Sequence, residues 1–141
     1  MDFMEDEQLR VTLEQGQDVV QGLVRFAREE GLSRARFVAE GELAYAILGS
    51  FDWRFEREQG ISVDGHIEAL SIVGWVHCEG AECTVDAHAN LVDRGGQNLG
   101  GPLLEGYVHG RMPVVLTGLS SQAAVGSLGR TGGDTGARTG A

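Results

Sequence analysis

Residues 83–91 read CTVDAHANL, and this stretch has the sharpest alternation of apolar and polar residues in the chain. Successive side chains of a β-strand point to opposite faces, so every second residue shares a face. One face is largely apolar from Cys83 to Leu91, whereas Asp86, His88 and Asn90 lie together on the other. The pattern therefore predicts a half-buried strand with one polar face.

The flanking sequence extends this strand into a sheet. Residues 66–78 form a longer run that is fairly apolar on both faces, which is typical of a central strand or of a strand covered on both sides. Residues 79–82, between the two runs, are typical of a hairpin turn. The same patterning predicts further strands at residues 9–13, 36–39, 43–51, 53–58 and 103–116, the last as one bent strand or a pair.

One segment has the periodicity of a helix. Asp18 stands at the N-cap position, where its carboxylate can accept a hydrogen bond from a free amide of the first turn. Apolar residues then recur at helical spacing up to Gly31, the residue type that commonly ends a helix. We therefore expect an α+β fold, in which one main helix packs on a mixed, largely antiparallel sheet of about seven strands.

Length and composition suit a single domain. The chain has 141 residues, of which 42% are hydrophobic, enough to build a core. We expect the domain to span residues 8–119. Residues 120–141 consist mainly of Gly, Ser, Thr, Ala and Arg, a composition that predicts a flexible tail.

The charge balance excludes several classes of function. The 11 basic residues are all arginine and face 21 acidic residues, which gives a formal net charge of -10. Direct binding of nucleic acid needs a basic face that neutralises phosphates, so we expect none. The lack of lysine excludes a P-loop lysine and Schiff-base chemistry.

The sequence also indicates the cellular compartment of the protein. No apolar run reaches the ~18 residues of a membrane span. The first seven residues are acidic and lack the basic and apolar regions of a signal peptide. We expect a cytoplasmic protein without membrane contact.

Asp86 and His88 are the strongest local candidates for chemistry. Their spacing of two places a carboxylate and an imidazole on the same face of a strand. Such a pair can ligate a divalent metal, or the carboxylate can orient the histidine as a base. The alternative is a solvated strand face without a ligand.

Other metal-binding residue types are scattered. Cys78 and Cys83 flank the predicted hairpin turn, so they are either two reduced cysteines or a cross-strand thiol pair. His66 and His109 are isolated in the sequence, and we expect structural or surface roles for both. Residues 95–101 are glycine-rich but lack the Gly-Lys-Ser/Thr ending of a phosphate loop, which leaves a loop of special backbone conformation.

Several short motifs follow one another in a characteristic order. The two most specific are Glu-x-Leu-Ser-x-x-Gly at residues 68–74 and Gly-Gly-x-Leu-x-Glu-Gly at residues 100–106. With the segments at residues 16–20, 37–43, 47–52, 65–74 and 87–91, this order resembles the plants-and-prokaryotes-conserved (PCC) domain, which accompanies AT-hook motifs in plants. The resemblance spans about residues 9–119 and points to the stand-alone prokaryotic type.

The resemblance implies a homotrimer with a cleft between subunits. The resemblance also implies three histidines in that cleft, as in stand-alone prokaryotic members: a His-x-His pair on one strand and a histidine after Gly-Gly. Three such imidazoles suit a zinc-like metal. At the matching positions stand Asp86, His88 and Pro102, so two of the three imidazoles are missing. We therefore expect no cofactor; the alternative is a divalent, zinc-like metal held by Asp86 and His88.

Two classes of function remain. We expect a non-enzymatic module that self-associates and binds a protein partner, in a regulatory, DNA-associated role. Direct DNA binding is not expected, because of the charge and because Gly129–Gly132 lacks the proline of an AT-hook core. The alternative is a small-ligand or metal site, with enzymatic activity, in the inter-subunit cleft. Its candidate residues are Asp86, His88, Asn90, Gly100, Gly101, Glu40 and Glu42.

Overall fold

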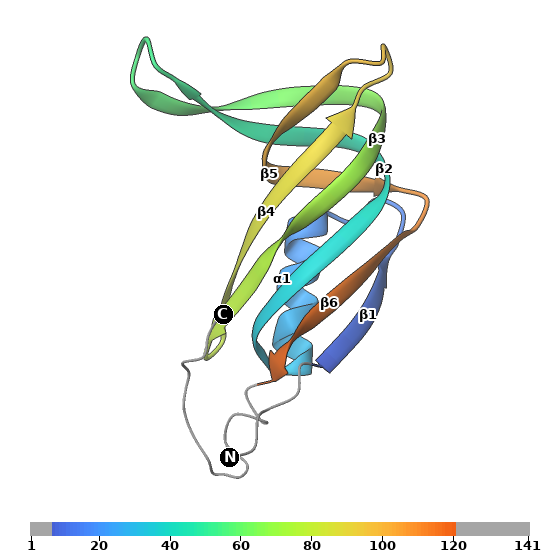
Figure 1. The fold of residues 1–141 in the computed structure, drawn as a ribbon, viewed down its shortest axis with the longest axis vertical. Helices are drawn as coiled ribbons and strands as arrows, with labels where there is room; N and C mark the ends of the chain where they lie inside the picture. Colours follow the sequence, from blue (N-terminus) through green and yellow to red (C-terminus); the bar gives the residue numbers. More distant parts are fainter. Residues whose placement is uncertain (1–6, 121–141) are drawn as a thin grey trace.

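The computed structural model describes residues 7–120, which form one sheet of six strands and one helix (Figure 1). In chain order the elements are β1 (Glu7–Leu13), α1 (Val19–Glu30), β2 (Leu32–Asp52), β3 (Arg57–Glu79), β4 (Glu82–Val92), β5 (Asn98–His109) and β6 (Met112–Ser120). The predicted tail lies, from residue 121 onward, outside the described residues.

The sheet is antiparallel throughout residues 7–120. Its strand order is β1-β6-β2-β3-β4-β5, and β5 pairs additionally with β2. Strands β2, β3, β4 and β5 therefore close a circuit of hydrogen-bonded neighbours. This circuit curls one end of the sheet, while β1 and β6 extend the other end as a flatter layer (Figure 1).

The predicted α+β class is wrong, because strands make up most of the described chain and the fold is largely β. The expected mixed sheet of about seven strands is an antiparallel sheet of six. Two predicted strands, residues 36–39 and 43–51, are parts of the single strand β2. Register shifts after Ala39 and after Leu43 interrupt the alternation of buried and exposed residues. The strand itself continues through both shifts, so the interrupted pattern wrongly predicted two strands.

Two further strand boundaries differ from the prediction. The alternating residues 53–58 were expected to form a strand, but residues 53–56 form the turn between β2 and β3. Residues 103–116 follow the second of the two alternatives and form parts of β5 and β6, which are joined at Gly110. Gly110 has a φ of 80°, a conformation that glycine adopts without steric cost.

Helix α1 begins and ends at the predicted residues. The Oδ2 atom of Asp18 accepts a hydrogen bond from the amide of Gln21 at 2.8 Å, and Gly31 ends the helix with a φ of 69°. The Oδ1 atom of Asp18 accepts from the amide of Gly106 at 2.9 Å, so the same carboxylate ties the helix to β5. No helix among residues 7–120 has the length and apolarity needed to span a membrane.

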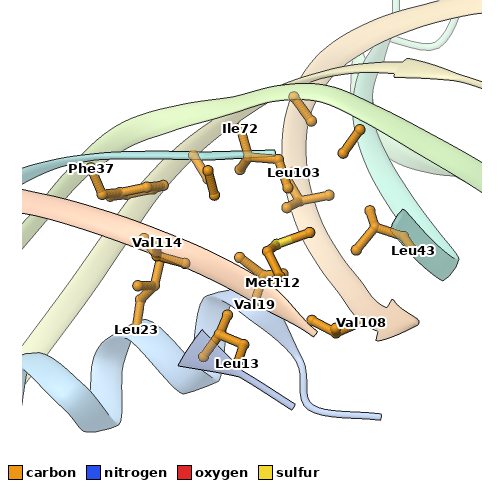
Figure 2. Packing of buried hydrophobic residues seen from close by; sticks show 14 of the residues in the cluster. Leu13, Val19, Leu23, Phe37, Leu43, Ile72, Leu103, Val108, Met112 and Val114 are labelled. Atoms are coloured by element: carbon orange, nitrogen blue, oxygen red, sulfur yellow. The ribbon is translucent and has the colours of Figure 1, made fainter. Parts of the chain in front are cut away.

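The core lies between α1 and one face of the sheet. The buried residues of the helix are Val19, Gly22, Leu23 and Ala27. Figure 2 shows Leu23 beside Val114 of β6 and Val19 beside Met112, beneath Phe37 and Ile72 of the central strands. Within the described chain no polar or charged residue is buried, so burial of apolar surface, about 1.5–3 kcal/mol for each large side chain, holds the two layers together.

Beyond the core, β2 and β3 continue as a projecting hairpin (Figure 1). None of the residues 49–62 is buried. The tip nevertheless carries aromatic side chains: Trp53 is 80% exposed and lies edge-on to Phe51, with ring centroids 4.4 Å apart. Arg54 and Arg57 both lie over the ring of Phe55. The hairpin arm thus presents an aromatic tip to solvent.

Candidate ligand-binding face

The outer face, which we define as the sheet face turned away from α1, is crossed by one row of directly paired residues. In strand order the row reads Arg10, Val115, Val38, Val73, His88 and Pro102. Directly opposed residues have Cβ atoms about 5 Å apart, so each side chain of the row lies beside the next. His88 is therefore flanked by Val73 on β3 and by Pro102 on β5.

The polar residues of β4 lie on this outer face. Asp86 and His88 are exposed and Asn90 is half-buried, whereas the alternate residues Ala87 and Ala89 face the core. The strand alternation that the sequence predicts is thus present, and the three polar side chains stand in one column along β4.

A tryptophan stands beside this column. Trp75 of β3 is paired directly with Asp86, and the guanidinium of Arg34 lies 4.7 Å from the centre of the Trp75 ring. Sequence reasoning placed Trp75 only within an apolar strand. Its position beside Asp86 follows from the β3–β4 register, which no local pattern reveals.

The glycines at the start of β5 also belong to the sheet. The stretch 95–101 was expected to be a loop, but residues 98–101 are paired with β4, with Gly100 opposite Asn90. Gly101 is buried, and a Cβ atom on it would lie 3.3 Å from the carbonyl oxygen of Gly49. A side chain there would be tightly placed, because β5 crosses close to the backbone of β2.

The two glutamates proposed for the site lie farther off. Glu40 is exposed on β2, so the whole of β3 separates it from His88 on β4. Glu42 pairs with Glu68 on one side and with His109 on the other. The structure therefore brings Asp86, Asn90 and Gly100 to His88 but leaves Glu42 in a different neighbourhood.

These residues do not fit the metal that the family resemblance implies. Pro102 is the direct cross-strand neighbour of His88 and occupies the position of an expected histidine, but its ring has no lone pair to donate. Within residues 7–120 no three His, Cys, Asp or Glu side chains are grouped so as to hold a metal ion. Asp86 and His88 alone leave such a centre one protein ligand short.

A second polar group lies where β5 passes the start of α1. The hydroxyl of Tyr107 donates a hydrogen bond to Oε1 of Glu105 at 2.7 Å. This bond raises the pKa of Tyr107 above its ordinary value of 10.0, and burial and the charges of Glu105 and Asp18 act in the same direction. Sequence reasoning did not single out this pair.

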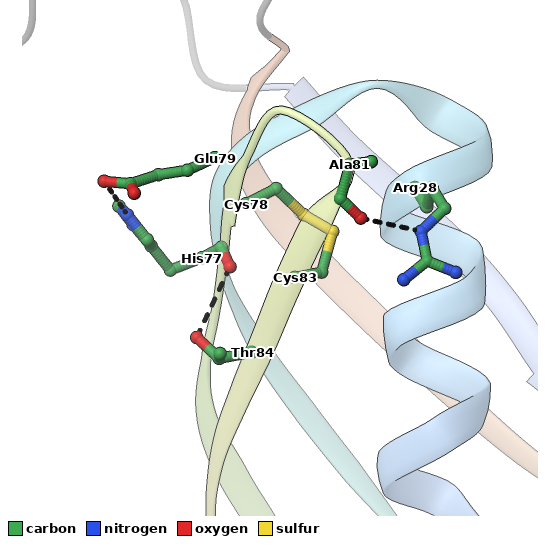
Figure 3. The surroundings of a disulfide bond; sticks show 7 residues. All are labelled: Arg28, His77, Cys78, Glu79, Ala81, Cys83 and Thr84. Atoms are coloured by element: carbon green, nitrogen blue, oxygen red, sulfur yellow. Dashed lines mark hydrogen bonds and ion pairs between the residues drawn. A yellow bond between two sulfur atoms is a disulfide. The ribbon is translucent and has the colours of Figure 1, made fainter.

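The two cysteines form a disulfide at the tip of the β3–β4 hairpin (Figure 3). Cys78 and Cys83 are directly opposed in the register, so of the two alternatives left by the sequence the cross-strand pair is realised. The Nε atom of Arg28 donates to the carbonyl oxygen of Ala81 at 3.1 Å, which fastens the hairpin turn to the end of α1. Cys78 and Cys83 lie on the face of the hairpin that packs against the core, whereas His77 and Thr84 lie on its outer face.

The sequence of residues 4–120 matches the family model of the Plants and Prokaryotes Conserved (PCC) domain. The match covers most of the chain and the whole of the sheet described above. The chain belongs to the PCC-domain family. No curated protein matches it closely enough to count as a relative.

Solved structures share this PCC fold. A plant- and prokaryote-conserved protein from Pyrococcus horikoshii is 25% identical, with a TM-score of 0.74 over 85% of this chain and 83% of that one. A metal-containing protein from Archaeoglobus fulgidus is 24% identical, with a TM-score of 0.73 over 84% of both chains. A protein from Ralstonia eutropha described as a candidate DNA-binding protein is 23% identical, with a TM-score of 0.69 over 79% and 77%. The last two likenesses show the fold alone.

Proposed function

We propose that this PCC-domain protein is a homotrimer that self-associates through its outer face and binds a protein partner in a regulatory role. The observation that carries the proposal is the apolar surface left open on that face. Its largest exposed side chains are Val38 (56% exposed), Leu104 (49%), Leu70 (43%), Val73 (40%) and Trp75 (39%). Contiguous apolar surface of this kind marks an interaction site.

The sequence of β3 gives an independent reason. Residues 66–78 are apolar on both faces, a pattern of strands that are covered on both sides. In the single chain the helix and core cover only the face that carries Ile72 and Val76. A second copy on the outer face would cover Val73 and Trp75 and complete the pattern.

A protein partner suits this chain better than a DNA duplex. Relatives of the family are described as candidate DNA-binding proteins. The net charge of -10 opposes close approach to phosphates, and a trimer would carry three times that charge. We therefore place any DNA-associated role in recruitment by another protein, and we place the protein in the cytoplasm. In that reducing compartment the Cys78–Cys83 disulfide of the structure would be open to reduction.

The alternative function is a small-ligand site around Asp86 and His88. What favours it is the column of exposed polar side chains on β4 with the indole of Trp75 beside Asp86. An aromatic face with a carboxylate and an imidazole can bind a small polar molecule. Screening for ligands that raise the unfolding temperature, compared with His88→Ala, tests this alternative.

Self-association is tested by introducing a charge into the centre of the outer face. Light scattering on the full chain is expected to give three times the chain mass for the native sequence and one chain mass for Val73→Asp. Burying an uncompensated carboxylate between Val38 and His88 costs several kcal/mol at each contact. Gln21→Glu, on the solvent side of α1, is the control that adds the same charge. A monomeric native protein, or a trimeric Val73→Asp, would contradict the proposal.

A further inference from the structure

The hairpin arm, residues 49–62 of β2 and β3, leaves the body of the sheet (Figure 1). The pairing of β2 with β5 ends at Leu48, so beyond this residue β2 pairs only with β3. None of the arm residues is buried. A two-stranded hairpin with both edges open is marginally stable in water, so the arm gains stability when another surface covers it.

The large exposed apolar side chains of residues 7–120 fall into two groups. One group consists of the five outer-face residues named above. The other group lies on the arm and consists of Phe51, Trp53, Phe55 and Ile61. Aromatic side chains and arginine are enriched in protein interfaces, and Arg54 and Arg57 lie among the aromatic residues of the arm tip. Both groups therefore have the composition of an interface.

Neither surface is covered within the chain. Trp53 is 80% exposed at the arm tip, and Val73 and Trp75 remain exposed on the outer face, so the arm does not fold back over its own sheet. The arm continues β2 and β3 in unbroken pairing as far as Asp52 and Arg57. At ~3.3 Å per residue, residues 49–54 carry the tip roughly 20 Å beyond Leu48, where it can reach a neighbouring molecule.

A ring of three identical chains needs two different surfaces on each chain. Around a three-fold axis every contact is heterologous, because one surface of a chain meets another surface of the next chain. The described chain has two exposed apolar surfaces that can fill these two roles. We propose that, in the trimer proposed above, the arm tip of each chain docks on the outer face of the next chain. This inference rests on the proposed trimer and names the two surfaces that meet in it.

The charges of the two surfaces suit this contact. The guanidinium carbons of Arg54 and Arg57 lie 5.9 Å and 5.3 Å from the centre of the Phe55 ring, and neither arginine forms an ion pair within residues 7–120. The outer face carries the exposed carboxylate of Asp86 beside Trp75. Most of the surface of a chain with a net charge of -10 repels a second copy, whereas guanidiniums at the arm tip can meet a carboxylate and an indole.

Light scattering on the full chain tests the contact with an arm variant, Trp53→Ser/Phe55→Ser. We expect three chain masses for the native sequence and one for the arm variant. The concentration at which the trimer dissociates should rise roughly a hundredfold or more, because buried aromatic residues carry much of the binding energy of an interface. Gln59→Ser, which also changes an exposed residue of the arm, is the matched control and should remain trimeric.

Mixing two variants distinguishes this contact from a direct contact between two outer faces. The arm variant keeps an intact outer face, and Val73→Asp keeps an intact arm. A one-to-one mixture should therefore contain a species of two chain masses, in which the arm of the Val73→Asp chain docks on the face of the arm variant. Assembly stops there, because no intact arm and no intact face are left over.

The outcomes separate this inference from the proposed function. A monomeric native chain would refute the proposed trimer and this inference with it. A trimeric arm variant would overturn arm docking, leave the trimer standing and assign the arm tip to a different protein. The absence of a two-chain species from the mixture would also overturn arm docking. Because no arm residue is buried, circular dichroism of the arm variant should match the native spectrum, so a lower mass reports lost contact rather than unfolding.

Discussion

Gly74 of β3 is the position where the structure predicts the largest effect from the smallest change. Gly74 pairs with Ala87, next to Asp86 on β4. A Cβ atom added to Gly74 would lie 1.9 Å from the carbonyl oxygen of Asp86, 2.9 Å from its carbonyl carbon and 3.0 Å from the Cα atom of Ala87. All three atoms belong to the backbone of β4, so no side-chain rotation can relieve the contact.

The expected cost of Gly74→Ala follows from this geometry. Forcing extra atoms into a packed region typically costs about 1–3 kcal/mol, and a clash with backbone belongs at the upper end. The loss of glycine's freedom in the unfolded chain returns about 0.4–1 kcal/mol. The net loss in unfolding free energy is therefore about 2 kcal/mol or more, which lowers Tm by roughly 6–10 °C for a chain of this size.

Thermal unfolding followed by circular dichroism, at one fixed protein concentration, measures this loss. Gly100→Ala is the matched control, because it lies on the neighbouring β5 and a Cβ there would have only an ordinary contact of 3.6 Å with the Ala89 carbonyl oxygen. We expect its Tm to equal or slightly exceed that of the native chain. Equal Tm values for Gly74→Ala and Gly100→Ala would refute the reasoning, since β4 would then move aside without cost.

Two further predictions concern the margins of the sheet. Because the raised pKa of Tyr107 favours its neutral form, the Tyr107–Glu105 bond stabilises the fold below pH 10 and loses this effect as the pH rises through the folded-state pKa. Glu105→Gln should lower that pKa, as measured by tyrosinate absorbance in a Tyr45→Phe background; an unchanged titration would contradict the assignment. The Cys78–Cys83 bridge closes a loop with a sequence separation of 5, so its loss in Cys78→Ser/Cys83→Ser should cost no more than about 2 kcal/mol and leave the fold intact, as denaturant unfolding with and without reductant would show. Unfolding of the double variant in native buffer would count against that account.

The elements that the sequence predicted correctly depend on local interactions. The cap at Asp18, the glycine end of α1 and the alternation of β4 involve residues within a few positions of one another. The errors arose where strand pairing overrides local pattern. Strand β2 passes through two register shifts unbroken because β3 pairs with it along nearly its whole length, and that support is not visible in the sequence of β2. The α+β prediction failed because strands, several of them longer than their local pattern indicates, make up most of the described chain.

The candidate functional residues of the outer face also divide into those predictable from local sequence and those that depend on strand pairing. Side chains two apart on one strand share a face by geometry alone, so the column of Asp86, His88 and Asn90 could be read from sequence, as could the family to which the motifs belong. The approach of His66 to His109, whose ring centroids are 5.9 Å apart, the place of Trp75 beside Asp86 and the joining of Cys78 to Cys83 required the register between strands. The register depends on long-range contacts, because it is set by which apolar faces are buried together. It is therefore defined only in the folded sheet.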